Sequence, residues 1–214
     1  MPTSMYAKLV VAIISTRSAT NRMPNVRAAK RCMEHASAPV RLVYGPDPAQ
    51  AQRWLCERGY FVDWRMGDTV HAGKLGIWMT YIQVMEEAAA AHKANTSTHT
   101  LWIENDVVMT DEICREAVRA TNADKQDSSE WYTYEGEYNS LNLINNRHAA
   151  NFLEWAKEVG IKKPLDIQVW GSKRNSTPRK FKTAKPARRE YPSTITTTSR
   201  IKFDGLTKAR ICQY

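Results

Sequence analysis

Short apolar runs alternate with helix-length amphipathic segments along residues 1–170, and this alternation limits the possible folds more than any other feature of the sequence. The run KLVVAII at 8–14 is short and β-branched, as in a strand that is buried on both faces. The segment PNVRAAKRCMEHAS at 24–37 then places apolar residues at helical spacing, with a proline near its first turn. Strands that alternate with helices predict an α/β domain with a mostly parallel central sheet.

The same pattern assigns the rest of this domain. We expect further strands at 40–45 (VRLVYG), 60–64 (YFVDW) and 98–104 (THTLWIE), and two short strands around Gly136 within 131–144. We expect further helices at 47–59, 73–93, 110–121 and 145–160, the first ended by Gly59 and the last by Gly160. The inner face of the 73–93 helix is expected to hold Ile77, Tyr81, Val84, Met85 and Ala88.

The excess positive charge of the chain lies in its C-terminal segment. Residues 171–214 hold twelve lysines and arginines against two acids, whereas residues 1–170 hold 19 basic and 20 acidic side chains. The segment also has little periodicity and many breaker and hydroxyl residues, as in a loop-rich tail. We therefore expect one domain at 1–170 and a basic segment at 171–214 that packs on it or extends from it. Such a localised charge suits a phosphate-bearing partner.

The cysteines and the apolar runs bear on the cellular compartment. Four scattered cysteines, Cys32, Cys56, Cys114 and Cys212, show neither a zinc pattern nor a disulfide pattern. They indicate buried reduced thiols in a cytoplasmic protein, which would lie in the host cytoplasm if the protein is viral. No apolar run approaches the roughly 20 residues of a transmembrane helix, and no signal-peptide cleavage site follows the first run.

Several common active sites lack their motifs here. The first strand leads into STRSATNR at 15–22, which does not contain the G-x-G-x-x-G of a dinucleotide site. Neither a P-loop nor the G-x-S-x-G of an α/β-hydrolase occurs. The five histidines form no H-x-x-x-H pair, so each is expected to be a surface or packing residue.

Polar residues follow two of the expected strands. In an open α/β sheet, ligands bind outside the carboxyl ends of the strands. The first strand ends in the hydroxyls of Ser15 and Thr16, and the guanidinium groups of Arg17 and Arg22 follow. These groups match the sugar hydroxyls and the phosphates of a nucleotide. The second polar group is END at 104–106, which interrupts the apolar segment HTLWIENDVVMT at 99–110.

The carboxylates of Glu104 and Asp106 are hard oxygen ligands. A Mg²⁺ or Mn²⁺ ion is commonly held by one or two carboxylates together with substrate phosphates. Such an ion on a diphosphate would neutralise the charge that develops on a leaving group. The alternative is that both residues simply begin a solvated turn, and the spacing alone does not decide between the two readings.

Two neighbouring blocks resemble a known family. GKLGIWMTYIQVMEEA at 73–88 and TLWIENDVVMTDEI at 100–113 are similar to the pattern of glycosyltransferase family 25, which includes lipopolysaccharide-modifying and collagen galactosyltransferases. In that family a helix begins G-E-I-G-C-x-x-S-H and a strand ends E-D-D. Further similar blocks follow the family's order over most of the chain: VVAIISTRSATNRMPNVRA at 10–28, YNSLNLINNRHAANFLEWAKE at 138–158, KKPLDIQVW at 162–170 and YPSTITTTSRI at 191–201.

The chain departs from this pattern at several positions. Asn105 stands where the family has an acid, although the outer acids Glu104 and Asp106 are kept. Thr80 and Tyr81 take the place of the Ser-His pair, and an acid is replaced at the start of the same helix by Lys74. These changes bear on metal affinity and on the choice of acceptor.

The resemblance implies a GT-A-like nucleotide-sugar-binding fold at 1–170 and inverting transfer of a sugar from a nucleotide diphosphate donor, such as a UDP-sugar. It implies that Glu104 and Asp106 hold Mn²⁺ or Mg²⁺ on the diphosphate and that Asn105 is directed at donor hydroxyls. The donor-binding residues that it implies are Ser15, Thr16, Arg17, Arg22, Gly73, Lys74 and Asn105.

An inverting transferase also needs a general base for the acceptor proton. Asp166 in PLD is the first candidate and Glu137 in YEGEY is the second. An equally good reading of Asp166 from the local pattern is the N-cap of a last helix.

The acceptor is left open by the sequence. A saccharide or glycoconjugate is the first reading, and a hydroxylated base in DNA, modified by a transferase of a bacterial virus, is the second. A third is a non-catalytic nucleic-acid-binding module on a degenerate transferase fold. A polyanionic acceptor, either DNA or an anionic glycan, would meet the basic side chains of the C-terminal segment, first among them Lys173, Arg174, Arg179, Lys180 and Lys182.

Overall fold

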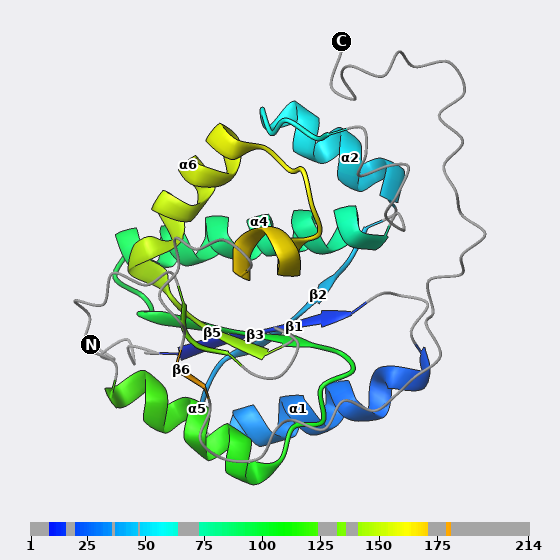
Figure 1. The fold of residues 1–214 in the computed structure, drawn as a ribbon. Helices are drawn as coiled ribbons and strands as arrows, with labels where there is room; N and C mark the ends of the chain where they lie inside the picture. The colour runs from blue at the N-terminus through cyan, green and yellow to red at the C-terminus, as the bar shows by residue number, and fades with distance from the viewer. Residues whose placement is uncertain are drawn as a thin grey trace.

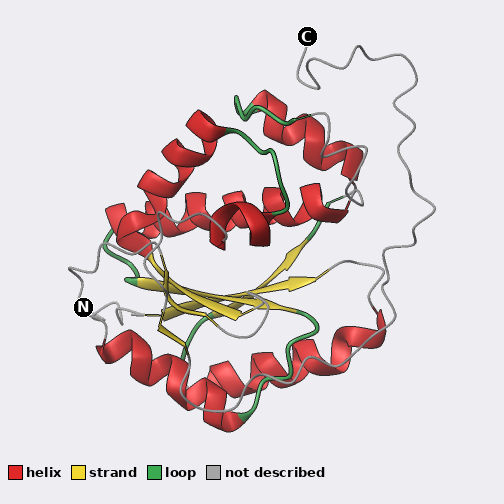
Figure 2. Cartoon of the chain, viewed as in Figure 1, coloured by secondary structure: helices red, strands yellow, loops and turns green. Residues whose placement is uncertain are grey.

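The computed structural model of the chain describes residues 9–15, 20–35, 37–46, 48–63, 73–123, 132–135, 141–170 and 179–180. These residues form an α/β fold of three layers, with a twisted sheet between two layers of helices (Figures 1 and 2). The strands are β1 (Leu9–Ser15), β2 (Val40–Tyr44), β3 (His99–Glu104), β4 (Tyr132–Glu135), β5 (Leu141–Asn145) and β6 (Arg179–Lys180).

The sheet has the order β2-β1-β3-β5-β4-β6. The pairs β1–β2, β1–β3 and β4–β6 are parallel, whereas β5 runs antiparallel to both of its neighbours, β3 and β4. The α/β class is therefore confirmed, and β5 is the strand that makes the sheet mixed. The predicted loop region after residue 170 contributes the short strand β6.

One layer of helices, above the sheet in Figure 1, consists of α2 (Pro48–Glu57), α4 (Gly73–Lys93) and α6 (Ala149–Val159), with the π-helix η4 (Asp166–Trp170) packed beside them. The central helix of this layer is α4, which contacts both α2 and α6 as well as the core over the sheet. In α4, Trp78 and Ile82 are fully buried, although a single inner stripe would leave both outside. The predicted stripe on α4 is therefore too narrow, because neighbours cover the helix on several sides.

The other layer consists of α1 (Met23–His35) and α5 (Asp111–Ala123), which lie below the sheet in Figure 1. Their apolar residues, such as Met33 and Ala117, pack with residues of β1, β3 and β5 in a second core. Thr110 precedes α5 and caps it, since its hydroxyl accepts a hydrogen bond of 3.3 Å from the Ile113 amide. Two acids follow in the first turn, where the helix dipole favours negative charge.

The predicted elements differ from the structure in few places. The expected strand at 60–64 is wrong for its described part, 60–63, where the pairing is a single bridge between Val62 and Ile161. The expected helix at 145–160 begins instead with the 3-10 turn η3 (Asn146–His148). The two predicted stops are confirmed, since Gly59 and Gly160 have φ values of +78° and +73° just beyond α2 and α6. Among the described residues, no helix is long and apolar enough to cross a membrane.

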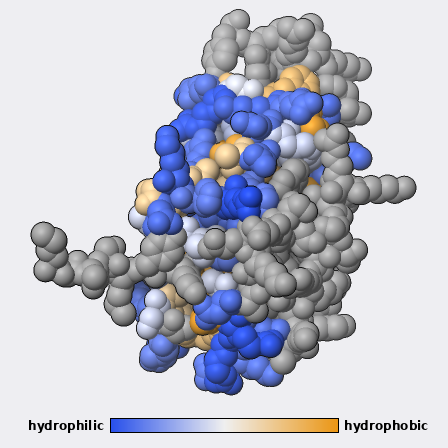
Figure 3. Space-filling view, turned by 90° about the vertical axis from the view of Figure 1, so that its left-hand side faces the viewer, coloured by the Kyte–Doolittle hydropathy of each residue, from blue (hydrophilic) through white to orange (hydrophobic). Residues whose placement is uncertain are grey.

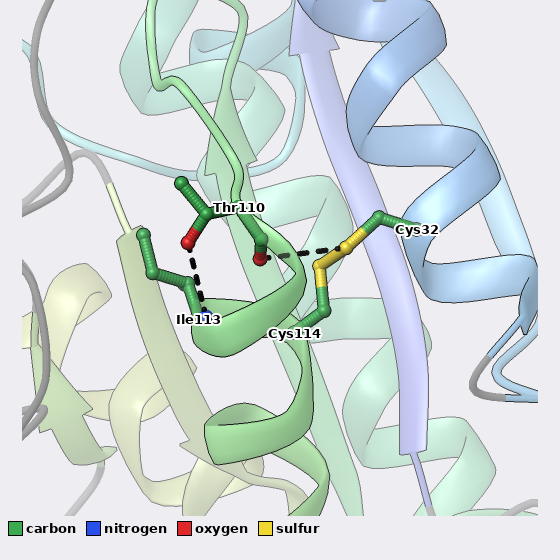
Figure 4. Close-up of a disulfide and its surroundings, with 4 residues drawn as sticks. All are labelled: Cys32, Thr110, Ile113 and Cys114. Carbon is green, nitrogen blue, oxygen red and sulfur yellow. Dashed lines mark hydrogen bonds between the residues drawn. A yellow bond between two sulfur atoms is a disulfide. The ribbon is translucent and has the colours of Figure 1, made fainter.

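The prediction of reduced thiols is wrong for Cys32 and Cys114. These residues form a disulfide that joins α1 to α5, with their Cα atoms 6.3 Å apart (Figure 4). Cys56 is also disulfide-bonded. The sequence could not show the first bridge because its partners are 82 residues apart and meet only after both helices pack on the same face of the sheet. The bridge also removes the argument from reduced thiols for a cytoplasmic protein.

The surface of the described part is mainly polar on the side that Figure 3 shows, with a few small hydrophobic patches between hydrophilic residues. Three large hydrophobic side chains of the described residues are exposed: Tyr44, Phe61 and Ile167. Of these three, only Tyr44 ends a strand of the sheet, at the carboxyl end of β2.

Tyr60, which follows α2, gives the fold a pH dependence. Burial raises the pKa of its phenol from 10.0 to about 12, and the charge of Glu86 adds to the increase. The folded state therefore keeps the neutral phenol at pH values at which the unfolded chain has lost the proton. Stability should fall as the pH rises from 10 to 12, and the Tyr60→Phe variant should lose less stability over that range. Urea denaturation at several pH values measures this, and an equal loss in both proteins would contradict the assignment.

Candidate functional site

Three parallel strands bring their carboxyl ends to one edge of the sheet. Ser15 at the end of β1 is in register with Tyr44 at the end of β2, and Ile14 is in register with Glu104 at the end of β3. The Gly45 amide donates a 2.7 Å hydrogen bond to the Ser15 carbonyl oxygen, which joins the first two strands beyond their ends. This edge is where ligands bind in open α/β sheets, and it carries most of the described donor-site residues that the sequence predicted.

Asn105 is the centre of a polar cluster at this edge. Its side-chain amide donates a 2.9 Å hydrogen bond to the Ser15 hydroxyl, and its amide oxygen accepts one of 2.8 Å from the Arg22 guanidinium. The Asn25 amide donates to the Asn105 backbone carbonyl oxygen at 3.4 Å. The loop after β3 is thus tied to the end of β1 and to the beginning of α1.

Asp106 adds a charge to the same cluster. Its carboxylate oxygen Oδ2 lies 4.0 Å from Nη1 of Arg22, and both side chains are largely buried, with 7% and 15% of their surfaces exposed. At such burial a carboxylate without a nearby cation would be costly, so Arg22 supplies the charge that lets Asp106 lie there. The predicted proximity of Asp106 to the loop after β1 is therefore present in the structure. We use the name Arg22 cluster for Ser15, Arg22, Asn25, Asn105 and Asp106.

The arrangement bears on the predicted metal site. Side chains alternate along β3, with Trp102 in the core under α4 and Ile103 in the core over α1 and α5, so Glu104 follows Trp102 towards the α4 side. Asp106 instead meets Arg22 on the α1 side. The described residues contain no group of three His, Cys, Asp or Glu side chains placed to hold a metal ion. A divalent cation shared by Glu104 and Asp106 does not fit this arrangement, because Asp106 faces a guanidinium, and metal binding there stays a prediction.

Asn105 is also placed differently from its predicted use. It is buried, with 7% of its surface exposed, and both atoms of its amide contact protein groups. The geometry makes Asn105 a positioning residue for Ser15 and Arg22. A contact between Asn105 and donor hydroxyls stays a prediction.

The first turn of α4 borders the same edge. A Cβ on Gly76 would lie 3.5 Å from the Pro46 carbonyl oxygen, so α4 begins directly against the loop that leaves β2. Gly73 and Lys74 precede this contact, and Lys74 is partly exposed. The two residues in the place of the family's Ser-His pair lie in the core instead. Thr80 donates to backbone carbonyl groups of α4, and Tyr81 packs edge-on against Trp102 and Phe152.

The remaining predicted residues are distributed as follows. Asp166 is exposed at the first position of η4, on the side of the sheet that α4 and α6 cover. Arg179 and Lys180 form β6, at the opposite edge of the sheet from β2. Six predicted residues lie outside the described part of the chain: Thr16, Arg17, Glu137, Lys173, Arg174 and Lys182.

Tyr44 is a residue that the sequence analysis missed. It is 44% exposed and stands beside Ser15 at the carboxyl edge. The sequence offered one signal for it, an aromatic residue near the end of the predicted 40–45 strand. The same residue type at that position also fits a buried side chain of the core, so the signal was ambiguous. An exposed aromatic ring at this edge offers a flat apolar surface to a ligand.

Comparison with known proteins gives little similarity. No family model matches the chain, and no curated protein matches its sequence. Among solved structures, the chain is similar to a glycosyltransferase involved in the glycosylation of the major capsid of PBCV-1, with 10% identity and a TM-score of 0.39. The alignment covers 70% of this chain and 66% of that one, just under two thirds of its length. The likeness is too weak to bear on the function.

Asn105→Ala tests the Arg22 cluster. Ser15 and Arg22 lose a hydrogen-bond partner in a buried place, so the free energy of unfolding should fall by about 1–3 kcal/mol. The control is Asn151→Ala, the same change at an exposed position of α6, which should alter stability by less than about 0.5 kcal/mol. Urea denaturation of both variants measures the difference, and equal small losses would show that the cluster contributes nothing to stability.

Proposed function

We propose that the protein is a glycosyltransferase that takes a sugar from a nucleotide diphosphate donor, such as a UDP-sugar, and transfers it to an acceptor hydroxyl. The observation that carries the proposal is the joining of the loops after β1 and β3 by Asn105, which contacts both Ser15 and Arg22 at the ligand-binding edge. The resemblance to glycosyltransferase family 25 suggests the reaction class. The contacts of Asn105 support a single site formed by the two sequence motifs, STRSATNR at 15–22 and END at 104–106.

The donor would lie across the ends of β2, β1 and β3. Its nucleobase would stack on the exposed ring of Tyr44, and its sugar hydroxyls would meet the Ser15 side of the edge. Lys74, at the partly exposed start of α4, would offer positive charge to the diphosphate. Thr16 and Arg17, outside the described residues, are proposed for the same donor.

The reaction then requires a base on the acceptor side. The acceptor oxygen attacks the anomeric carbon, the bond from that carbon to the diphosphate oxygen breaks, and the diphosphate leaves with the electron pair. The base takes the acceptor proton, which gives inversion in a single displacement. Asp166 remains the first candidate for this role, because its exposed carboxylate is on the α4 side of the sheet towards which Glu104 points. Glu137 is the second.

Mn²⁺ or Mg²⁺ remains part of the proposal only as a prediction at Glu104. Bound there with the donor phosphates, such an ion would supply a Lewis acid for the leaving diphosphate. Asp106 would act on the protein side, by holding Arg22 and the loop after β3 in place.

A saccharide or glycoconjugate is the proposed acceptor, and DNA is the alternative. The alternative rests on the charge of residues 171–214, where twelve basic residues stand against two acids. A non-catalytic DNA-binding module would show binding that weakens steeply with salt and no donor hydrolysis.

Tyr44→Ala tests the donor site. Loss of the ring should weaken UDP binding about ten- to a hundredfold, the usual range for one base stacked on an aromatic side chain. Inorganic pyrophosphate, which has no base, should bind both proteins equally. Phe61→Ala is the control, because Phe61 is similarly exposed but follows α2. Isothermal titration calorimetry measures all the affinities, and wild-type protein that binds neither UDP nor other nucleoside diphosphates would refute the proposed function.

Glu104→Gln tests the metal prediction. We expect slow hydrolysis of a UDP-sugar in the presence of Mn²⁺, and the variant should need about tenfold more Mn²⁺ for the same rate, since it loses a charged oxygen ligand. Glu87→Gln is the matched control, because Glu87 pairs with Arg41 on the surface. Asp106→Asn should lower the melting temperature without changing the Mn²⁺ dependence. A rate that does not respond to Mn²⁺, or to Glu104→Gln, would exclude metal binding at Glu104.

A further inference from the structure

The Cys32–Cys114 disulfide joins the same two chain segments that meet in the Arg22 cluster. Cys32 is on α1, the helix that begins directly after Arg22, and Cys114 is in the first turn of α5, the helix that follows the loop after β3. One segment supplies Arg22 and Asn25, and the other supplies Asn105 and Asp106. The two segments are thus connected twice, by the polar contacts at the sheet edge and by a covalent bond between their helices.

The bridge lies close to the beginning of α5. Cys32 Sγ is 3.6 Å from the carbonyl oxygen of Thr110, the residue whose hydroxyl caps α5 (Figure 4). Only three residues, 107–109, separate Asp106 from this cap. A change at the bridge therefore acts on a short segment, 107–110, whose other end carries the Arg22 cluster.

The two cysteines differ in their exposure to solvent. Cys32 is partly exposed, whereas Cys114 is 3% exposed. Cys32 is therefore the more accessible end of the bridge for a small thiolate, and attack there would release Cys114 as the leaving thiolate. Once reduced, Cys32 has an S–H group that faces the Thr110 carbonyl oxygen, which can accept a weak hydrogen bond from it.

We propose that Cys32–Cys114 is a reversible thiol–disulfide site that controls how firmly the Arg22 cluster is held. The reductant is a small dithiol. Its first thiolate forms a mixed disulfide with Cys32, and the Cys114 thiolate takes up a proton. Its second thiol then displaces Cys32 as a thiol, so that the bridge gains two electrons and two protons and the dithiol becomes a cyclic disulfide. In the reduced state α1 and α5 are no longer joined covalently, and the loop after β3 opens more often.

This inference concerns regulation of the proposed donor site, but its test does not need the donor. The amides of residues 104–110 should exchange with deuterium more than about tenfold faster after treatment with dithiothreitol, because a local opening no longer works against the covalent link. The strands β1 and β3 should change far less. Mass spectrometry of the alkylated protein reports which thiols are free.

Three variants separate this bridge from the other disulfide. Cys32→Ser should show the fast exchange without reductant, and its hydroxyl preserves a donor near Thr110. Cys114→Ser provides a second test of the same bridge from its buried end. Cys56→Ser is the matched control, since it removes a disulfide-bonded cysteine outside this bridge and should leave the exchange of 104–110 slow until dithiothreitol is added.

The outcomes are distinct. Fast exchange at 104–110 in the reduced protein and in both variants of the bridge supports the proposal, and weaker UDP binding in those states would extend it to the donor site. Unchanged exchange at 104–110 with Cys32 and Cys114 alkylated would overturn it, whether or not UDP binds. Failure of UDP to bind any form, with the exchange response intact, would count against the proposed function alone.

Discussion

The hydrogen bonds of Asn105 hold together parts of the chain that the sheet alone would leave separate. Strand pairing fixes β1 beside β3, but it ends at Glu104 and leaves the following loop without a ladder partner. Asn105 contacts Ser15 on one side and Arg22 on the other, so the loop after β3 is fastened both to its neighbouring strand and to the beginning of α1. An amide suits this position because it donates through one atom and accepts through the other. A carboxylate could accept from Arg22 but could not donate to Ser15.

That pairing explains how an amide, Asn105, is accommodated between two acids, Glu104 and Asp106. Three adjacent carboxylates would repel one another in a buried loop unless a cation were bound. With Asn105 in the middle, Asp106 is balanced by Arg22 within the protein, and the loop keeps its shape through hydrogen bonds. The proposed donor site is thus built on a charge balance that belongs to the chain itself. The Glu104 carboxylate, in contrast, is directed towards the α4 side of the sheet.

The sequence predicted the elements well because their signals are local. Periodicity located α4 at its observed bounds, and glycine chemistry located the ends of α2 and α6. The sequence also predicted that Ser15, Arg22 and Asp106 lie at one edge, since parallel strands share a carboxyl edge. It could not show which atoms Asn105 contacts, that Cys32 meets Cys114, or that Tyr44 is exposed, because each depends on packing between segments far apart in the chain. It misread the described residues 60–63, because the apolar side chains of Tyr60 and Val62 fill a core beside Ile161 without joining the sheet.

The position of β3 in the sheet has a consequence for biosynthesis. It pairs with β1 although β2, α2 and α4 come between them in the chain, and Ser15 is separated from Asn105 by 90 residues. Contacts of such range pay the entropy of closing a long loop before they gain any stability, so they form late in folding. A nascent chain that has produced only β1, α1 and β2 therefore has Ser15 and Arg22 but still lacks β3 and the loop that carries Asn105 and Asp106. The Arg22 cluster can therefore form only after the ribosome has released residues 99–106, well after β1 has been synthesised.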